Sequence, residues 1–81
     1  MTDINITNYT KTQCPNCTTA KMVMDMAGLD YKEIDIMVGD RFANFVAHYP
    51  DAKQMPQIFI NDQRVGGVAG LQAALKQLGK L

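Results

Sequence analysis

Two cysteines, Cys14 and Cys17, stand three positions apart in a chain of 81 residues. A dithiol at this spacing can exchange disulfides, whereas a structural bridge across so short a loop would contribute only about 2 kcal/mol before strain is subtracted. Inert core cysteines or half of a zinc site are the other interpretations, but zinc needs about four ligands. The single histidine, His48, is expected to be a surface or structural residue. The pair therefore predicts redox chemistry and no metal site.

Thiol exchange requires a thiolate, and an ordinary cysteine with a pKa of about 8.5 is mostly protonated at neutral pH. Pro15, a residue type preferred at the first helical position, directly follows Cys14. We therefore expect Cys14 at a helix N-terminus, where free backbone N–H groups favour an anion and Lys11 adds a positive charge nearby. Cys14 is the predicted nucleophile and Cys17, one turn further on the same face, the better covered resolving thiol. Asn16, between them, shapes the loop without an obvious acid-base role.

Apolar periodicity predicts seven elements around this pair. Strands are expected over residues 4–9, 31–36, 57–60 and 64–66, and helices over 15–27, from 39 or 40 to 49, and up to Gly79. The order βαβαββα implies a parallel right-handed crossover and a small α/β fold, with a four-stranded mixed sheet flanked by three helices. The cysteines then lie where the first strand passes into the first helix. At this length we expect one domain, residues 1–81, with a thin core.

Eight basic residues balance eight acidic ones, so the chain has no large field to attract nucleic acid or an anionic membrane. The stretch Met1–Tyr9 is too polar for a signal peptide, and no apolar run approaches the roughly 20 residues of a membrane span. We expect a cytoplasmic monomer with neither nucleic acid nor a membrane as partner.

The pair Met55-Pro56 opens the third expected strand. A cis proline there would turn the preceding carbonyl and N–H towards an extended substrate, although the isomer stays open at this point. Gly66 and Gly67, before the last helix, permit close approach of a peptide-like ligand to the backbone. A strand-initiating proline and a β-bulge are the alternatives that involve no substrate.

Three stretches of this chain resemble glutaredoxin signatures, in the same order and across nearly its whole length. They are Tyr9-Thr-Lys-Thr-Gln-Cys-Pro-Asn-Cys, Gln54-Met-Pro-Gln-Ile-Phe-Ile and Val65-Gly-Gly. The resemblance implies a thioredoxin-like fold with a cis proline and a groove for glutathione. Carried over residue by residue, the site comprises Lys11, Cys14, Asn16, Cys17, Met55, Pro56, Gly66 and Gly67. It implies glutathione as co-substrate, no tightly bound cofactor, and disulfide-containing protein substrates that include ribonucleotide reductase.

Two departures from this pattern define the alternatives. Many glutaredoxins have Tyr where Asn16 stands, and the polar or acidic residues that usually follow Gly-Gly are replaced here by Val68, Ala69 and Gly70. An NrdH-like redoxin reduced by thioredoxin reductase is therefore an alternative, although the Trp-Ser-Gly-Phe stretch of that group is absent. Some glutaredoxins carry a [2Fe–2S] cluster, and Pro15 and Cys17 argue against that function here.

Other apolar residues near the expected helices have no assigned chemistry. Met22, Met24 and Met26 cannot all line one helix face, so we expect them to fill gaps in the core. Val68 and Leu71 belong either to the core or to an exposed docking patch for a protein substrate.

Overall fold

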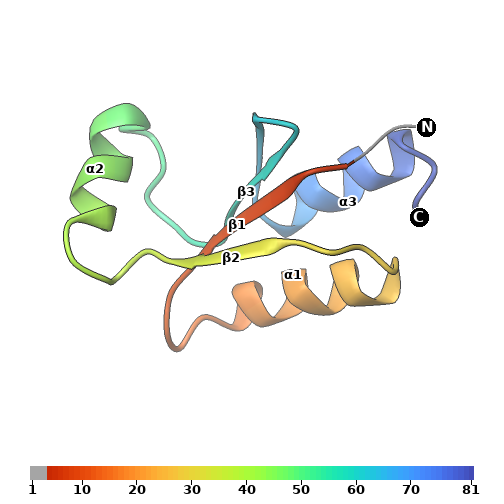
Figure 1. Ribbon diagram of the computed structural model, residues 1–81, viewed down its shortest axis with the longest axis horizontal. Helices are drawn as coiled ribbons and strands as arrows, with labels where there is room; N and C mark the ends of the chain where they lie inside the picture. Colours follow the sequence, from red (N-terminus) through yellow and green to blue (C-terminus); the bar gives the residue numbers. More distant parts are fainter. Residues whose placement is uncertain (1–3) are drawn as a thin grey trace.

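A computed structural model describes residues 4–81, so the first three residues of the polar N-terminal stretch lie outside it. The chain forms four strands and three helices in the expected order, and Figure 1 shows how they are arranged. They are β1 (Ile6–Thr10), α1 (Pro15–Met26), β2 (Lys32–Asp35), α2 (Arg41–His48), β3 (Gln57–Ile60), β4 (Gln63–Gly66) and α3 (Val68–Gln77). The order βαβαββα is thus confirmed, and the boundaries differ from the expected ones by one or two residues at most strand and helix ends.

The strands form one mixed sheet in the order β2-β1-β3-β4. β1 and β2 are parallel and joined through α1, whereas β3 pairs antiparallel with both β1 and β4. Asn61 and Asp62 form the turn between β3 and β4 with positive φ angles of 50° and 68°, a conformation that these two residue types tolerate. Gln63, which the sequence placed in the turn, instead pairs with Ile60 at the start of β4.

One face of the sheet packs against α1 and α3, because each of these helices contributes an apolar stripe to the same core. This core comprises Ile6, Ala20, Met24, Ile58, Ile60, Leu71 and Leu75. A second cluster joins α2 to the end of the fold that carries the cysteines. It comprises Cys17, Ile36, Phe45, Ala52 and Met55. α2 is anchored there by aromatic packing, with the rings of Phe45 and Tyr9 centred 4.8 Å apart.

The methionines of α1 do not behave as a group. Met24 is fully buried, but Met22 is 57% and Met26 83% exposed, so the expectation that all three fill the core was wrong. Only Met24 falls on the helix stripe shared with Ala20, because a helix of 3.6 residues per turn rotates the other two towards solvent. Leu71 is buried in the core, and Val68 is half-buried against it.

Candidate active site

Cys14 caps the N-terminus of α1, as the sequence predicted. Its backbone is extended (φ −124°, ψ 96°), and Pro15 occupies the first turn of the helix. The backbone N–H of Cys17 donates to the Sγ atom of Cys14 over 3.1 Å, and the N–H of Thr18 donates to the Cys14 carbonyl over 3.2 Å. A helix N-terminus that directs an N–H at a sulfur stabilises negative charge on it. Cys14 is therefore placed where a thiolate is favoured.

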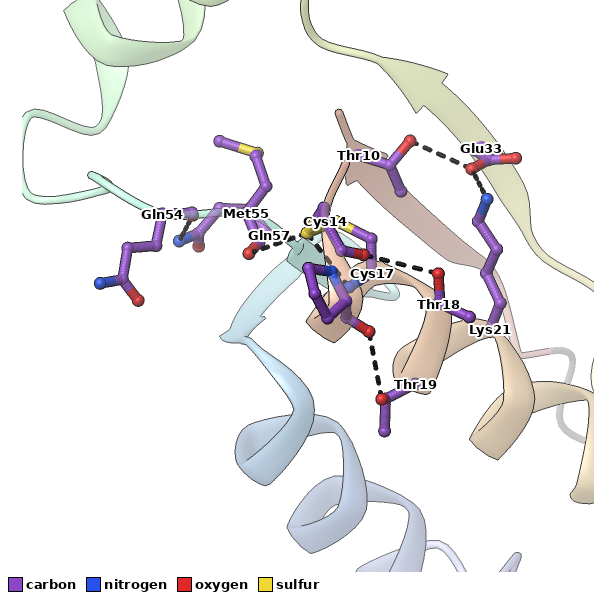
Figure 2. The surroundings of a disulfide bond; sticks show 11 residues. Thr10, Cys14, Cys17, Thr18, Thr19, Lys21, Glu33, Gln54, Met55 and Gln57 are labelled. Atoms are coloured by element: carbon purple, nitrogen blue, oxygen red, sulfur yellow. Dashed lines mark hydrogen bonds and ion pairs between the residues drawn. A yellow bond between two sulfur atoms is a disulfide. The ribbon is translucent and has the colours of Figure 1, made fainter. Parts of the chain in front are cut away.

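Cys14 and Cys17 form a disulfide, with their Cα atoms 5.2 Å apart (Figure 2). Cys17 is only 3% exposed, whereas Cys14 is partly exposed at the surface. A disulfide is attacked at the sulfur that an external thiol can reach, and access therefore distinguishes the two residues. This difference matches the expected division into an accessible nucleophile and a covered resolving thiol.

The bond between Met55 and Pro56 is cis, which resolves the isomer that the sequence left open. The carbonyl oxygen of Met55 lies 3.4 Å from the Sγ atom of Cys14. The preceding loop is held by Gln57, whose Nε2 donates to the carbonyl of Gln54 over 2.8 Å (Figure 2). The start of β3 therefore lies directly beside the disulfide.

A groove of about 310 Å³ opens at this place, and four of the expected site residues line it together: Asn16, Met55, Pro56 and Gly67. Its other lining residues are Gln54, Gln57, Val68, Ala69 and Gly70. None of these nine residues carries a charged side chain. Gly66, which comes directly before the lining residue Gly67, has a φ of 91°, a left-handed conformation that favours glycine. The groove thus offers backbone and amide groups, and no formal charge, to a bound chain.

Lys11 lies elsewhere, in a separate depression that it shares with Thr10, Thr12, Lys21, Glu33 and Asp35. The structure therefore does not bring Lys11 into the groove with the other expected binding residues. Glu33 of β2 forms an ion pair with Lys21 of α1 and accepts a hydrogen bond from the hydroxyl of Thr10 over 3.0 Å (Figure 2). Through Glu33, this network connects Thr10 of β1 with Lys21 of α1, the two elements on either side of Cys14.

The network shifts the ionisation of its members. The hydrogen bond from Lys21 lowers the pKa of Glu33, with a smaller contribution from Thr10 and against the opposing effect of burial. The same hydrogen bond raises the pKa of Lys21. The sequence does not reveal this network, because nothing in the linear order links a helical lysine to a glutamate in the next strand.

Gly70 is a second residue whose role the sequence did not reveal. A Cβ atom at this position would lie 1.7 Å from the carbonyl oxygen of Val65, so only glycine allows α3 to pack against β4. The resemblance emphasised the absence of a polar side chain at this position. Packing supplies the physical reason, because no side chain of any kind fits there.

Residues 6–65 match the family model of glutaredoxin. The chain belongs to the glutaredoxin family. It is 34% identical to glutaredoxin of Pseudomonas aeruginosa over 73 residues, which cover 90% of this chain and 86% of the relative. It is also 34% identical to glutaredoxin 1 of Rickettsia conorii over 65 residues, covering 78% of this chain and 64% of the relative. The chain thus spans less than two thirds of the length of some glutaredoxins that it matches.

The fold is thioredoxin-like, as the solved glutaredoxins show. Glutaredoxin 1 of Francisella tularensis superposes with a TM-score of 0.79 over 98% of this chain and all of that protein, at 23% identity. NrdH-redoxin of Escherichia coli superposes with a TM-score of 0.62 at 28% identity, over 78% of this chain and 82% of that protein. The fold expected from the resemblance is therefore confirmed.

His48 lies exposed at the end of α2, where its Nδ1 is 2.9 Å from the carbonyl oxygen of Asn44. Within residues 4–81, His, Cys, Asp and Glu nowhere form a group of three that could hold a metal ion. None of the helices described is long and apolar enough to cross a membrane.

Proposed function

We propose that this protein is a glutathione-linked thiol–disulfide oxidoreductase that reduces protein disulfides and mixed disulfides through Cys14 and Cys17. The observation that carries the proposal is the Cys14–Cys17 disulfide at the N-terminus of α1, with a helix N–H directed at Cys14 and only Cys17 covered. Family membership supports the same class of chemistry. Electrons would pass through sulfur alone, and no tightly bound cofactor is required.

The forward reaction begins with the Cys14 thiolate. It attacks one sulfur of the substrate disulfide, forms a mixed disulfide and releases the other substrate sulfur as a thiolate. Cys17 then gives its proton to that thiolate and attacks the sulfur of Cys14. The second substrate sulfur leaves as a thiolate and takes a proton from solvent, so the substrate is released as a dithiol and the protein takes up the disulfide form described above.

Two molecules of glutathione would regenerate the dithiol. The first attacks Cys14, forms a mixed disulfide and releases Cys17 as a thiol, and the second attacks the glutathione sulfur and releases glutathione disulfide. A buckwheat glutaredoxin with a similar fold, TM-score 0.74, has been solved as a complex with glutathione. In this chain, the groove along Asn16, Met55, Pro56 and Gly67 is the proposed glutathione site.

The test is turnover of a small disulfide by the purified protein with glutathione, glutathione reductase and NADPH. Turnover that disappears in the Cys14→Ser variant supports the proposal. A parallel reaction replaces the glutathione system with thioredoxin reductase. Turnover with the reductase and none with glutathione would reject glutathione as the electron source.

One observation favours that second outcome. The groove is lined by uncharged side chains, and Val68, Ala69 and Gly70 stand where an anchor for the charged γ-glutamyl end of glutathione is expected. The structural relative NrdH-redoxin is described as having a thioredoxin-like activity profile. Reduction by thioredoxin reductase is therefore our second candidate.

Ribonucleotide reductase is the protein substrate we propose, within the reducing cytoplasm that the sequence analysis favours. The proposal rests on the resemblance together with an accessible Cys14. Dithiol protein added to oxidised ribonucleotide reductase should support deoxyribonucleotide formation in proportion to the Cys14–Cys17 disulfide produced. Formation that does not depend on Cys14 would reject this substrate.

A further inference from the structure

Asn8 is a buried polar residue that the redox cycle described so far does not use. It lies in β1 with 0% exposure, and neither its amide nitrogen nor its carbonyl oxygen has a hydrogen-bond partner among the described residues. Alternation along β1 places it on the buried face with Ile6 and Thr10. A buried amide without partners weakens folding, whereas an apolar side chain would not. Packing alone therefore does not account for Asn8.

The lack of hydrogen-bond partners at Asn8 contrasts with the surroundings of its neighbours. Thr10, on the same face of β1, satisfies its hydroxyl by donating to Glu33 over 3.0 Å. Asn8 pairs in register with Glu33 of β2 and with Ile58 of β3, so it stands in the middle of the sheet. Ile58 is itself fully buried. Solvent therefore does not reach the amide.

The buried stripe of α1, which contains Cys17 and Ala20, covers this face of the sheet. Cys17 belongs to one apolar cluster and Ala20 to the other, which also contains Ile6 and Ile58. The first turn of α1 folds back from the end of β1 at Thr10 (Figure 2). Asn8, between Ile6 and Thr10, thus lies on the face of the sheet that α1 covers.

Reduction changes what Cys17 needs from its surroundings. Once the disulfide opens, the sulfur of Cys17, a residue only 3% exposed, must exist as a thiol or a thiolate in a cluster with Ile36, Ala52 and Met55. Apolar surroundings disfavour the thiolate and raise the pKa of a cysteine. A neutral amide offers both an N–H donor and a carbonyl acceptor, so it suits either form of the sulfur.

We propose that Asn8 is a positioning residue whose side-chain amide hydrogen-bonds the sulfur of Cys17 in the dithiol form. Its Oδ1 accepts from the Cys17 thiol, and its Nδ2 donates to the thiolate that resolves the mixed disulfide. Asn8 takes up no proton: the proton of Cys17 still passes to the departing substrate thiolate. In the disulfide form Cys17 has neither a proton for Oδ1 nor a negative charge to attract Nδ2, so both atoms of the amide are left without a partner. This inference rests on the dithiol cycle proposed above.

The first test measures the thiol pKa of Cys17 in a Cys14→Ser background, by the ultraviolet absorbance of the thiolate. Replacing Asn8→Leu should raise this pKa by about one unit, because the bond that Nδ2 donates to the charged sulfur is stronger than the bond that Oδ1 accepts from the neutral thiol. One unit is about a tenfold loss of thiolate near neutral pH. The same replacement in the chain with both cysteines should shift the equilibrium with glutathione roughly tenfold towards the disulfide, about 30 mV. An unchanged pKa and equilibrium would overturn the proposal.

The matched control is Asn44→Leu, the same chemical change on the exposed surface of α2. It should leave both the Cys17 pKa and the equilibrium constant unchanged. A purely structural role for Asn8 would instead appear as an equal change in thermal stability of the disulfide and dithiol forms, with both redox readouts unmoved. That pattern also rejects the proposal.

A third measurement needs no variant and does not depend on folding of Asn8→Leu. The Nδ2 amide resonances of Asn8 should move when the disulfide is reduced and should show contacts to the Cys17 β-protons. Unmoved resonances, or contacts to a trapped water instead, would overturn the role of Asn8. The pKa and resonance measurements need neither glutathione nor turnover, because a small chemical dithiol can reduce the disulfide, so they remain decisive even if turnover with glutathione fails.

Discussion

The Sγ atom of Cys14 and the carbonyl oxygen of Met55 lie 3.4 Å apart although 41 positions separate the two residues in the chain. Antiparallel pairing of β1 with β3 creates this contact, because it brings the start of β3 to the end of β1. The backbone next to Pro56 therefore lies beside the sulfur of Cys14. The position of Cys14 relative to the groove thus depends on one strand pairing.

Removing Cys17 should stop the reaction at the mixed disulfide between Cys14 and the substrate. In Cys17→Ser the mixed disulfide on Cys14 has no internal thiol to resolve it, so one equivalent of covalent adduct should accumulate with a protein disulfide substrate. Cys14→Ser should form no adduct and lose turnover by roughly three orders of magnitude or more, as removal of a nucleophile does. Intact-protein mass spectrometry measures the adduct. An adduct on Cys17 in the Cys14→Ser variant would reverse the assignment of roles.

Restoring a carboxylate to the groove should strengthen its interaction with glutathione. Ala69 is exposed and lines the groove in the first turn of α3, so Ala69→Asp can present a carboxylate to the ammonium of the γ-glutamyl end. One added ion pair at an exposed site is worth about 0.5 to 1 kcal/mol, so the KM for glutathione should fall roughly two- to fivefold.

Ala73→Asp is the matched control, since Ala73 is exposed on α3 and does not line the groove. It adds the same charge and should leave KM for glutathione unchanged. Equal effects of the two variants would mean that overall charge, and not the groove, determines the interaction with glutathione.

Sequence reasoning predicted the parts of this fold that local chemistry controls. Pro15 after Cys14 set the start of α1, and Gly28 and Gly79, both with positive φ, follow the ends of α1 and α3 as expected. The Cys-x-x-Cys motif placed the disulfide at the correct junction. Each of these signals acts over one helical turn, a range within which a sequence can be interpreted without its fold.

The remaining features depend on contacts between distant segments. In the sequence, Gly70 is one of the residues that replace the polar or acidic side chains expected after Gly-Gly. The need for glycine there comes from the Val65 carbonyl across the β4–α3 junction. Asn8 interrupted the apolar face of β1, and its burial could not be inferred from a polar residue in an alternating strand. The resemblance grouped Lys11 with the residues of the groove, whereas Lys11 lines a different depression.

The close approach of Gly70 to Val65 predicts an unusual cost for a small change. Alanine is normally preferred to glycine in a helix by about 1 kcal/mol. Gly70→Ala should instead destabilise the protein by about 2 kcal/mol or more, because its Cβ would overlap the Val65 carbonyl and force α3 away from β4. Chemical denaturation of the disulfide form measures the free energy of unfolding.

Gly28→Ala separates the steric effect from the conformational one. Gly28 has a φ of 71° and open space around its Cα, so its replacement should cost only about 1 kcal/mol from the left-handed backbone. A Gly70→Ala protein that is as stable as the parent would show that α3 and β4 are not packed as described.

The network of Glu33 predicts a specific pH dependence of stability. Its hydrogen bond with Lys21 lowers the pKa of Glu33 below 4.5, so its contribution is fully present above about 4.5 and is lost as pH falls through the lowered value. The pKa of Lys21 is raised above 10.5, so its contribution is fully present below about 10.5 and is lost as pH rises through the raised value. The ion pair therefore stabilises the fold between these limits.

Glu33→Gln tests this window, because the amide can still accept from Thr10 but carries no charge. Both ionic partners are more than one third exposed, so the variant should lose only about 0.5 kcal/mol at neutral pH. The difference from the parent should vanish as pH falls below the pKa of Glu33. Denaturant unfolding across the acidic range measures it, with Asp30→Asn on the surface as control. A difference that stays constant with pH would show that Glu33 acts through its shape or its hydrogen bond to Thr10, and not through its charge.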